Sequence, residues 1–182
     1  MSGKNVGVFG IFSTRVAAEN ATESLVRAGF PTNDISVLLP ESLGGPKDMG
    51  TEKATKAPEG AAAGVTTGGV IGGALGVLAG VGLLAIPGLG PFIAAGPIMA
   101  GLAGLGVGGA VGGVTGALVG MGIPEFEAKR YEGRLKTGGI LLSVHCDTSE
   151  EITRAKDVLK NTGAEDVSST SESSVNVKKQ GA

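Results

Sequence analysis

Short apolar runs on either side of a helical stripe mark the first part of the chain. Residues 4–12 are apolar enough for a buried strand, and residues 35–39 form a second apolar run that ends at Pro40. Between the two runs, Ser13 is a candidate N-cap, and Gly29 suits the position just after a helix. The expected helix would bury a stripe of Val16, Ala17, Ala21, Leu25 and Ala28. This pattern predicts a β-α-β unit.

The last part of the chain repeats the same pattern. Residues 139–145 predict a strand, and Thr148 and Glu151 have the spacing of a capping box at the start of a helix. Gly163 would follow that helix, and Val167 opens a weak last strand. The buried stripe of the second helix would contain Ile152, Ala155, Val158 and Leu159. We interpret the two parts as a weak internal repeat.

Together the two units predict an α+β fold, a ferredoxin-like β-α-β-β-α-β domain. Residues 1–42 and 138–170 would close into one split domain around an insertion. The alternative is two independent tails. Each tail alone would bury little apolar surface, which favours the single domain.

The middle of the chain carries no charge. None of the 65 residues between Glu59 and Glu125 is Asp, Glu, Lys, Arg or His. Prolines and glycines over residues 86–91 should break a helix, which predicts helices over residues 60–86 and 92–123. Each helix would exceed the roughly 30 Å of a bilayer's hydrocarbon core. The run therefore predicts a helical hairpin over residues 60–123 that enters a membrane.

Glycine recurs at every fourth residue of this segment. Residues four apart lie on one face of a helix, so each helix would carry a ribbon without side chains, and two ribbons could pack backbone to backbone. The first ribbon contains Gly60, Gly64, Gly68, Gly72, Gly76 and Gly80, and the second contains Gly104, Gly108, Gly112, Gly116 and Gly120. This glycine zipper predicts close helix packing within or between copies of the chain.

Two other interpretations compete with a membrane hairpin. A flexible linker is disfavoured because linkers are polar and rich in serine. An apolar hairpin enclosed by protein in a large soluble assembly stays open, because glycine and alanine make the segment only mildly hydrophobic. If the hairpin spans a bilayer, lysines and arginines near both of its ends place both termini in the cytoplasm.

Three connecting segments complete the predicted organisation. Residues 43–59 are polar and predict an exposed loop, and residues 171–182 predict a disordered tail. Residues 124–137 predict an amphipathic juxtamembrane helix, with a solvated connector helix as the alternative. Its candidate interfacial side chains are Phe126, Lys129, Arg130, Tyr131 and Arg134.

Composition offers little chemistry. The net charge is −2, and basic residues do not cluster with aromatic ones, so we expect no nucleic-acid partner. The single histidine, His145, adjoins the single cysteine, Cys146, and neighbours on a strand point to opposite faces. No set of residues has the spacing of metal ligands. The sequence predicts a non-enzymatic protein without a cofactor.

Four segments of the chain resemble one bacterial family. They are VGVFGIF, ATKAPEGAAAG, AIPGLGPFIAAGP and GMGIPEFEAKRYEGRLKTGGILLSVH. Over roughly residues 4–170 the chain is similar to glycine-zipper, general-stress-protein-like proteins, often described as similar to the ActD subunit of alternative complex III. The resemblance implies a cytoplasmic ferredoxin-like domain with a two-helix hairpin in the bacterial inner membrane. It also implies a structural, stress-related role, and it supplies no residue-level site.

Two functions follow as hypotheses. The first is a membrane-associated structural protein that forms homo-oligomers through its glycine ribbons, because two full-length ribbons exceed what one intramolecular contact needs. The second is an accessory subunit of a respiratory or other redox complex, where the apolar hairpin would provide an anchor or conduit for quinone or lipid. A small-molecule regulatory module rests on fold analogy alone.

Overall fold

The fold contains one antiparallel sheet and several helices. The computed structural model describes residues 5–44, 75, 82–86, 89–96 and 113–171. The strands are β1 (Val6–Phe12), β2 (Ile35–Pro40), β3 (Gly82–Ile86), β4 (Gly90–Ala95), β5 (Ile140–Cys146) and β6 (Glu165–Ser171). The helices are α1 (Arg15–Arg27), the 3-10 turn η1 (Thr32–Asp34), α2 (Glu41–Gly44), α4 (Gly113–Gly120), α5 (Glu125–Lys136) and α6 (Ser149–Asn161). The predicted α+β class is confirmed.

Strand pairing joins the two ends of the chain. The strand order is β3-β4-β2-β5-β1-β6, and every neighbouring pair is antiparallel. β5 lies between β1 and β2, so Val6 faces Cys146 on one side and Ile35 faces Val144 on the other. The sheet thus contains strands from the beginning, the middle and the end of the sequence.

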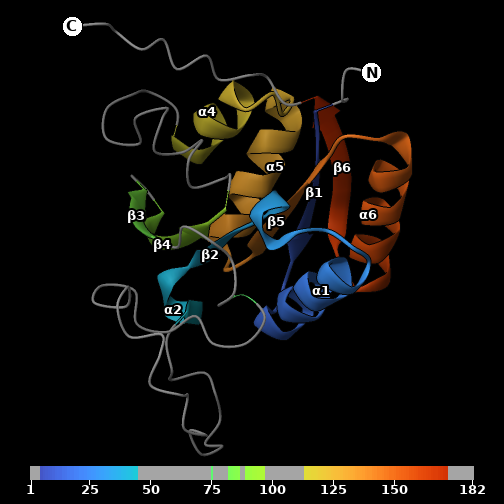
Figure 1. Cartoon of the computed structure of the whole chain (residues 1–182). Helices are drawn as coiled ribbons and strands as arrows, with labels where there is room; N and C mark the ends of the chain where they lie inside the picture. The colour runs from blue at the N-terminus through green and yellow to red at the C-terminus, as the bar shows by residue number, and fades with distance from the viewer. Residues whose placement is uncertain (1–4, 45–74, 76–81, 87–88, 97–112, 172–182) are drawn as a thin grey trace, which may run out of the picture.

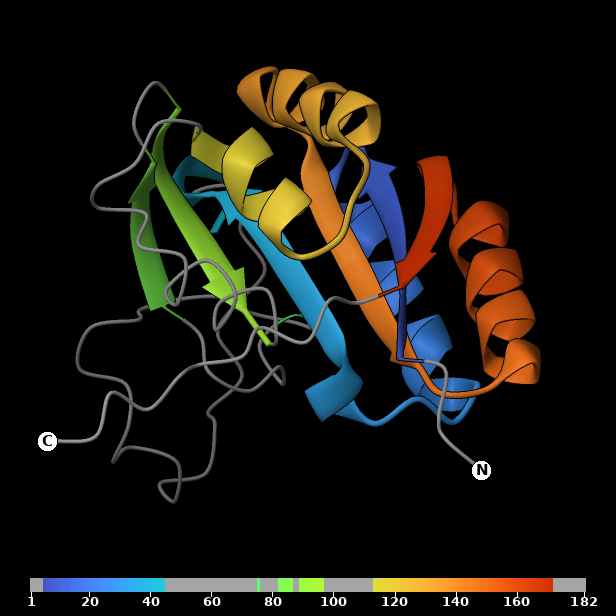
Figure 2. The same cartoon turned by 90° about the horizontal axis from the view of Figure 1, so that it is seen from above.

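Helices cover both faces of this sheet (Figures 1 and 2). α1 and α6 lie side by side on one face, and α4 and α5 lie together on the other. Alternate residues of each strand therefore reach two separate cores. β5 sends Leu142 and Val144 to the α1–α6 side and Leu141 to the α4–α5 side. Burial on both faces explains why β1, β2 and β5 are continuous apolar runs.

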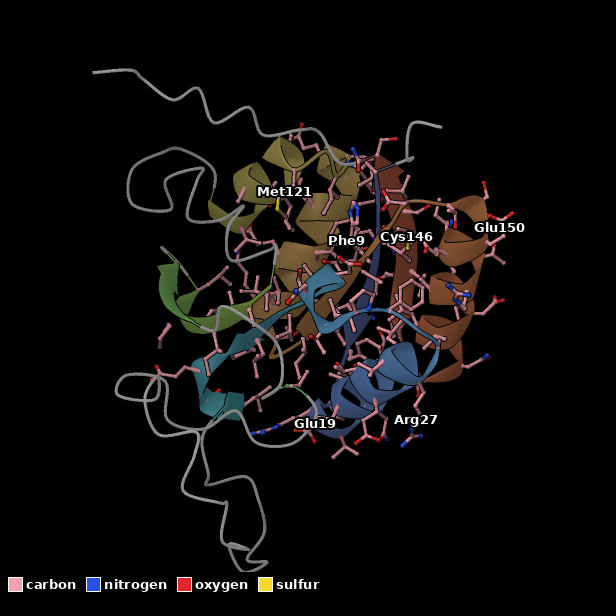
Figure 3. The ribbon with its side chains drawn as sticks, in the orientation of Figure 1. Phe9, Glu19, Arg27, Met121, Cys146 and Glu150 are labelled. Carbon is pink, nitrogen blue, oxygen red and sulfur yellow. The ribbon has the colours of Figure 1, made fainter. Side chains whose placement is uncertain are left out.

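The two cores differ in the parts of the chain that build them. The first core includes Cys146, whereas Phe9 lies in the second and Met121 packs against it (Figure 3). The second core also takes Phe92 and Leu118 from the segment without charges, and both side chains are at most 2% exposed. Part of the uncharged segment is thus a structural component of the domain.

The predicted division of residues 60–123 into two helices is wrong where the structure describes strands. β3 and β4 form a β-hairpin that extends the sheet from β2, with Val37 opposite Ala95. The Pro-Gly region over residues 86–91, which should end one helix, instead contains the end of β3 and the start of β4, and Gly90 within it has a φ of +88°. β2 has an edge that needs a partner, and the hydrogen bonds gained there add to the poor helix propensity of a glycine-rich chain in favouring the strand.

Several local predictions also need correction. Thr14 caps α1 in place of Ser13, since its side chain accepts a hydrogen bond from the Ala17 N–H. Val16 was placed on the buried stripe but is 67% exposed, because α1 buries Ala18, Ala21, Thr22 and Leu25. α2 occupies the start of the predicted loop over residues 43–59, and Ser171 belongs to β6 and not to a tail.

The structure does not describe the rest of the predicted hairpin. Residues 60–74, 76–81 and 97–112 lie outside the described residues, as do most of the predicted loop and residues 172–182. Within the described ranges, no helix has the length and apolar character needed to cross a bilayer.

Gly96, the residue that follows β4, allows a test of the β-hairpin. Its φ is +76°, and an added Cβ would lie 2.9 Å from Ser36 Cα and closer still to Ile35 O. Gly96→Ala should therefore lower the free energy of unfolding by about 2 kcal/mol or more. Gly133→Ala is the matched control, because Gly133 lies within α5 with open space around it and should gain up to about 1 kcal/mol. Urea unfolding of both variants measures the difference, and equal stabilities would contradict the β4 position.

The capping box of α6 predicts a pH dependence. The Glu151 carboxylate accepts hydrogen bonds from the backbone N–H of Asp147 at 2.8 Å and of Thr148 at 3.1 Å. The hydrogen bond from Asp147 lowers the pKa of Glu151 from its ordinary 4.5; burial opposes this shift, and the hydrogen bonds with Thr148 add to it. A lowered folded pKa gives stability that is complete above pH 4.5 and is lost as the pH falls through the folded value.

Glu151→Ala should thus lower the free energy of unfolding by about 1 kcal/mol at pH 7, and the loss should shrink in strongly acid solution. Glu150→Ala is the control, since Glu150 is an exposed neighbour in the same turn and should lose only about 0.3 kcal/mol. Urea unfolding at pH 7 and at acid pH checks both. A loss independent of pH would show that the carboxylate charge is not involved.

Candidate assembly surface

α4 has one buried face and one exposed face. Val114, Ala117 and Leu118 are at most 7% exposed and pack in the second core. Gly116 and Gly120, four residues apart, lie on the exposed side. We call these two residues the outer glycine row of α4. The helix buries Val114 and Leu118 in the second core, and it leaves the two glycines and Val119 on the outer side.

Glu132 of α5 holds the beginning of α4. Its carboxylate accepts hydrogen bonds from the Thr115 N–H at 3.1 Å and from the Thr115 hydroxyl. It also pairs with Lys136 at 2.7 Å. Partial burial raises the pKa of Glu132, but the hydrogen bonds from Lys136 and Thr115 outweigh it, so the pKa lies below the usual range. A carboxylate at a helix N-terminus satisfies N–H groups that the helix itself leaves unpaired.

The chain between α4 and α5 forms a rigid corner, which we call the α4–α5 corner (residues 119–126). Gly122 has a φ of +97°, and the Ile123 N–H bonds back to Leu118 O at 3.0 Å, an arrangement typical of a helix C-terminus. Ile123 is buried, and the Thr170 hydroxyl donates to Gly122 O at 2.6 Å. Bonds to α4 and to β6 thus fix the direction in which α5 starts.

α5 packs its apolar stripe on the sheet. Ala128, Tyr131 and Leu135 are each at most 1% exposed, and the Tyr131 ring centroid lies 6.4 Å from that of Phe9. The prediction that Tyr131 lies at a membrane interface is therefore wrong. The amphipathic pattern of residues 124–137 is present, but its apolar stripe faces the domain's own second core.

A cluster of polar contacts, which we call the α5–β6 clasp, connects α5 to the edge strand β6. The Tyr131 hydroxyl donates to Asp166 O at 2.8 Å and lies 2.7 Å from Ser168 Oγ. Arg130 pairs with Asp166, and Arg134 pairs with Glu165. Burial raises the pKa of Tyr131, and the hydrogen bond with Ser168 partly offsets the rise. At neutral pH Tyr131 therefore remains a neutral hydrogen-bond donor.

A bulge in β6 makes this clasp possible. The β1–β6 register shifts between Phe9 and Ile11, and Asp166 has a φ of +52°. An extra residue bends an edge strand and re-aims its side chains. Asp166, Glu165 and Ser168 are not among the residues that the sequence predicts to act at this surface. The polar composition of the strand is the signal in the sequence that could indicate them.

The other predicted interfacial residues are exposed. Phe126 is 72% exposed, and the Arg130 guanidinium lies 5.8 Å from its ring centroid. Lys129 pairs with Glu125 at 2.6 Å, and the hydrogen bond and charge of each partner lower the pKa of Glu125 and raise that of Lys129. Arg130 and Arg134 serve the clasp. Of the five predicted residues, Phe126 and Lys129 are thus the two that are not part of the α5–β6 clasp.

The predicted helix-packing glycines are described only in part. Gly116 and Gly120 lie on α4 as stated. The remaining nine, which are Gly60, Gly64, Gly68, Gly72, Gly76, Gly80, Gly104, Gly108 and Gly112, lie outside the described residues.

Groups suited to catalysis are dispersed. Cys146 is buried in the first core, whereas His145 lies on the other side of β5, 3.4 Å from Asp147. In the described part of the chain, no three His, Cys, Asp or Glu side chains converge as metal ligands. A shallow cleft of about 210 Å³ beside the clasp is lined by Glu127, Arg130, Tyr131, Asp166, Val167 and Ser168. Two of its three ionic groups, Arg130 and Asp166, already pair with each other.

Comparisons of the chain with protein-family models, with curated proteins and with solved structures return no significant match.

The clasp yields a stability test. Tyr131→Phe keeps the ring but removes both hydroxyl contacts, which should lower the free energy of unfolding by about 1 kcal/mol. Val16→Ala, at an exposed position on α1 away from this cluster, should change it by less than about 0.5 kcal/mol. Urea unfolding of the two variants beside the parent protein gives both values. A loss for Tyr131→Phe no larger than that for Val16→Ala would contradict the hydrogen bonds of Tyr131 to β6.

Proposed function

We propose that this chain is a non-enzymatic structural protein that self-assembles through glycine-bearing helix faces at a membrane. The observation that carries the proposal is the outer glycine row of α4. Gly116 and Gly120 are exposed on a helix whose opposite face is buried in the domain. A bare backbone strip lets a second helix approach closely and gain dispersion contacts along its length.

We also infer that the domain is ferredoxin-like with additions. In support, β6, β1, β5 and β2 are consecutive in the sheet, and α1 and α6 both lie on one face. The additions are β3 and β4 at one edge and α4 and α5 on the other face. In this interpretation the added helices cover a face that the basic fold leaves open, and α4 presents its glycine row outward.

For the location we propose the bacterial inner membrane, on the basis of the long uncharged segment and of the family resemblance. One observation favours a second location, a large assembly in which the segment is enclosed by protein. Phe92, Ala94 and Val114 all come from the uncharged segment and are at most 2% exposed within the domain. Carbonate washing of cell membranes separates the two: retention supports the membrane, and release as large particles supports the enclosed assembly.

The assembly itself has a direct test. The full chain in mild detergent should sediment as a homo-oligomer. Gly116→Leu with Gly120→Leu should shift the mass to that of a monomer, because the new side chains hold a partner helix away. The helix itself should persist, since leucine is the better helix former.

Gly133→Leu is the matched control for this test. Gly133 is also an exposed glycine, but on α5, with no atom within 4 Å of an added Cβ. That variant should keep the oligomer. A monomeric parent protein, or an oligomer that survives both substitutions on α4, would overturn the proposed function.

A further inference from the structure

An exposed aromatic side chain and a bare strip of helix occur at the same corner of the domain. Phe126 is 72% exposed at the start of α5, six residues after the last residue of α4, and Val119 near the end of α4 is 41% exposed. The outer glycine row of α4 lies on the exposed side of that same helix. The corner thus offers both an exposed ring and a strip of helix without side chains.

We propose that Phe126 docks into the outer glycine row of a second copy of this chain, in a two-fold contact that the α4–α5 corners of both copies form. The inference rests on the proposed self-assembly and names the contact that produces it. In a two-fold contact the same patch must fit itself. An exposed ring beside a helix strip without side chains meets this condition, because each copy supplies one ring and receives the other.

The charges around Phe126 fit the same symmetry. Glu125 and Lys129 are one helical turn apart, their side chains are 67% and 65% exposed, and Phe126 lies beside Glu125. In an antiparallel contact between two α5 helices, Glu125 of each copy faces Lys129 of the other. The pair has no net charge, so it offers little to an anionic membrane surface or to nucleic acid. A second copy therefore fits this patch better than either of those partners.

The corner is also well prepared for docking. The Thr170 hydroxyl holds Gly122 O, and Ile123 is anchored in the second core. The α5–β6 clasp fixes the helix one turn further along. A fixed backbone loses little freedom on association, which leaves more of the contact energy available for binding.

Removal of the ring is the first experiment. In the full chain, Phe126→Ala should weaken self-association at least about tenfold, as measured by sedimentation velocity over a concentration series. Val16→Ala is the matched control, because Val16 is 67% exposed on α1, on the opposite face of the sheet. It should leave the association constant unchanged. Circular dichroism checks that both variants fold.

A charge exchange tests the two-fold symmetry. Glu125→Lys alone and Lys129→Glu alone should each weaken association, because each places like charges opposite one another. The double exchange should restore it, since the opposite charges then face each other again. If the single variants weaken association and the double variant does not restore it, the antiparallel arrangement is wrong.

A cross-link tests the contact itself. Phe126→Cys on a tagged chain, mixed with Gly120→Cys on an untagged chain, should give a disulfide-linked heterodimer under mild oxidation. The parent protein, which contains the buried native Cys146, gives the background level of disulfide cross-linking. Absence of the heterodimer in an assembled sample would overturn the contact.

The outcomes separate this inference from the proposed function. If the α4 glycine variants disperse the oligomer while Phe126→Ala retains it, the glycine row acts in assembly but Phe126 does not, and only the present inference falls. If the parent chain is monomeric, both fall.

Discussion

The fold depends on the need to cover both faces of its central strands. β1 and β5 are apolar on the two sides, with Val8 and Leu142 in one core and Phe9 and Leu141 in the other. The helices α1 and α6 can bury only the first set. The second set would remain in water without α4 and α5, and the burial of such side chains is worth about 1.5–3 kcal/mol each. The added layer is therefore required by residues at the two ends of the chain.

Local patterns predicted the outer parts of the chain well. The apolar runs and the Thr148–Glu151 capping box correspond to β1, β2, β5 and α6. These signals lie within a few residues of each other, so a single sequence contains them. The predicted helices are wrong at residues 82–86 and 90–95, where the structure has strands, because glycine spacing and absence of charge describe a segment that avoids water, whatever its backbone conformation. At these residues the strand conformation is favoured by pairing of β4 with the edge of β2, which is distant in sequence.

The same reasoning explains the errors in the candidate surface. The spacing of apolar residues over residues 124–137 predicts a helix with an apolar stripe. Such a stripe packs equally well on a bilayer or on a protein core, so the spacing does not distinguish the two. Tyr131 turned inward because its hydroxyl finds Asp166 O and Ser168 on β6, 35 or more positions away. The bulge at Asp166 creates that partner. A local sequence pattern does not predict this bulge, because the bulge depends on a contact with a side chain of another element.

The position of β5 between β1 and β2 has a consequence for synthesis. Val6 and Cys146 face each other although 140 positions separate them, so the first strand to leave the ribosome waits for one of the last. Closure of so long a loop costs entropy before any contact forms, and folds dominated by distant pairings form slowly. β2 and β4 are closer in sequence and can pair earlier. The hairpin of β3 and β4 thus gives β2 one of its two final neighbours early, before β5 is available to pair with its other edge.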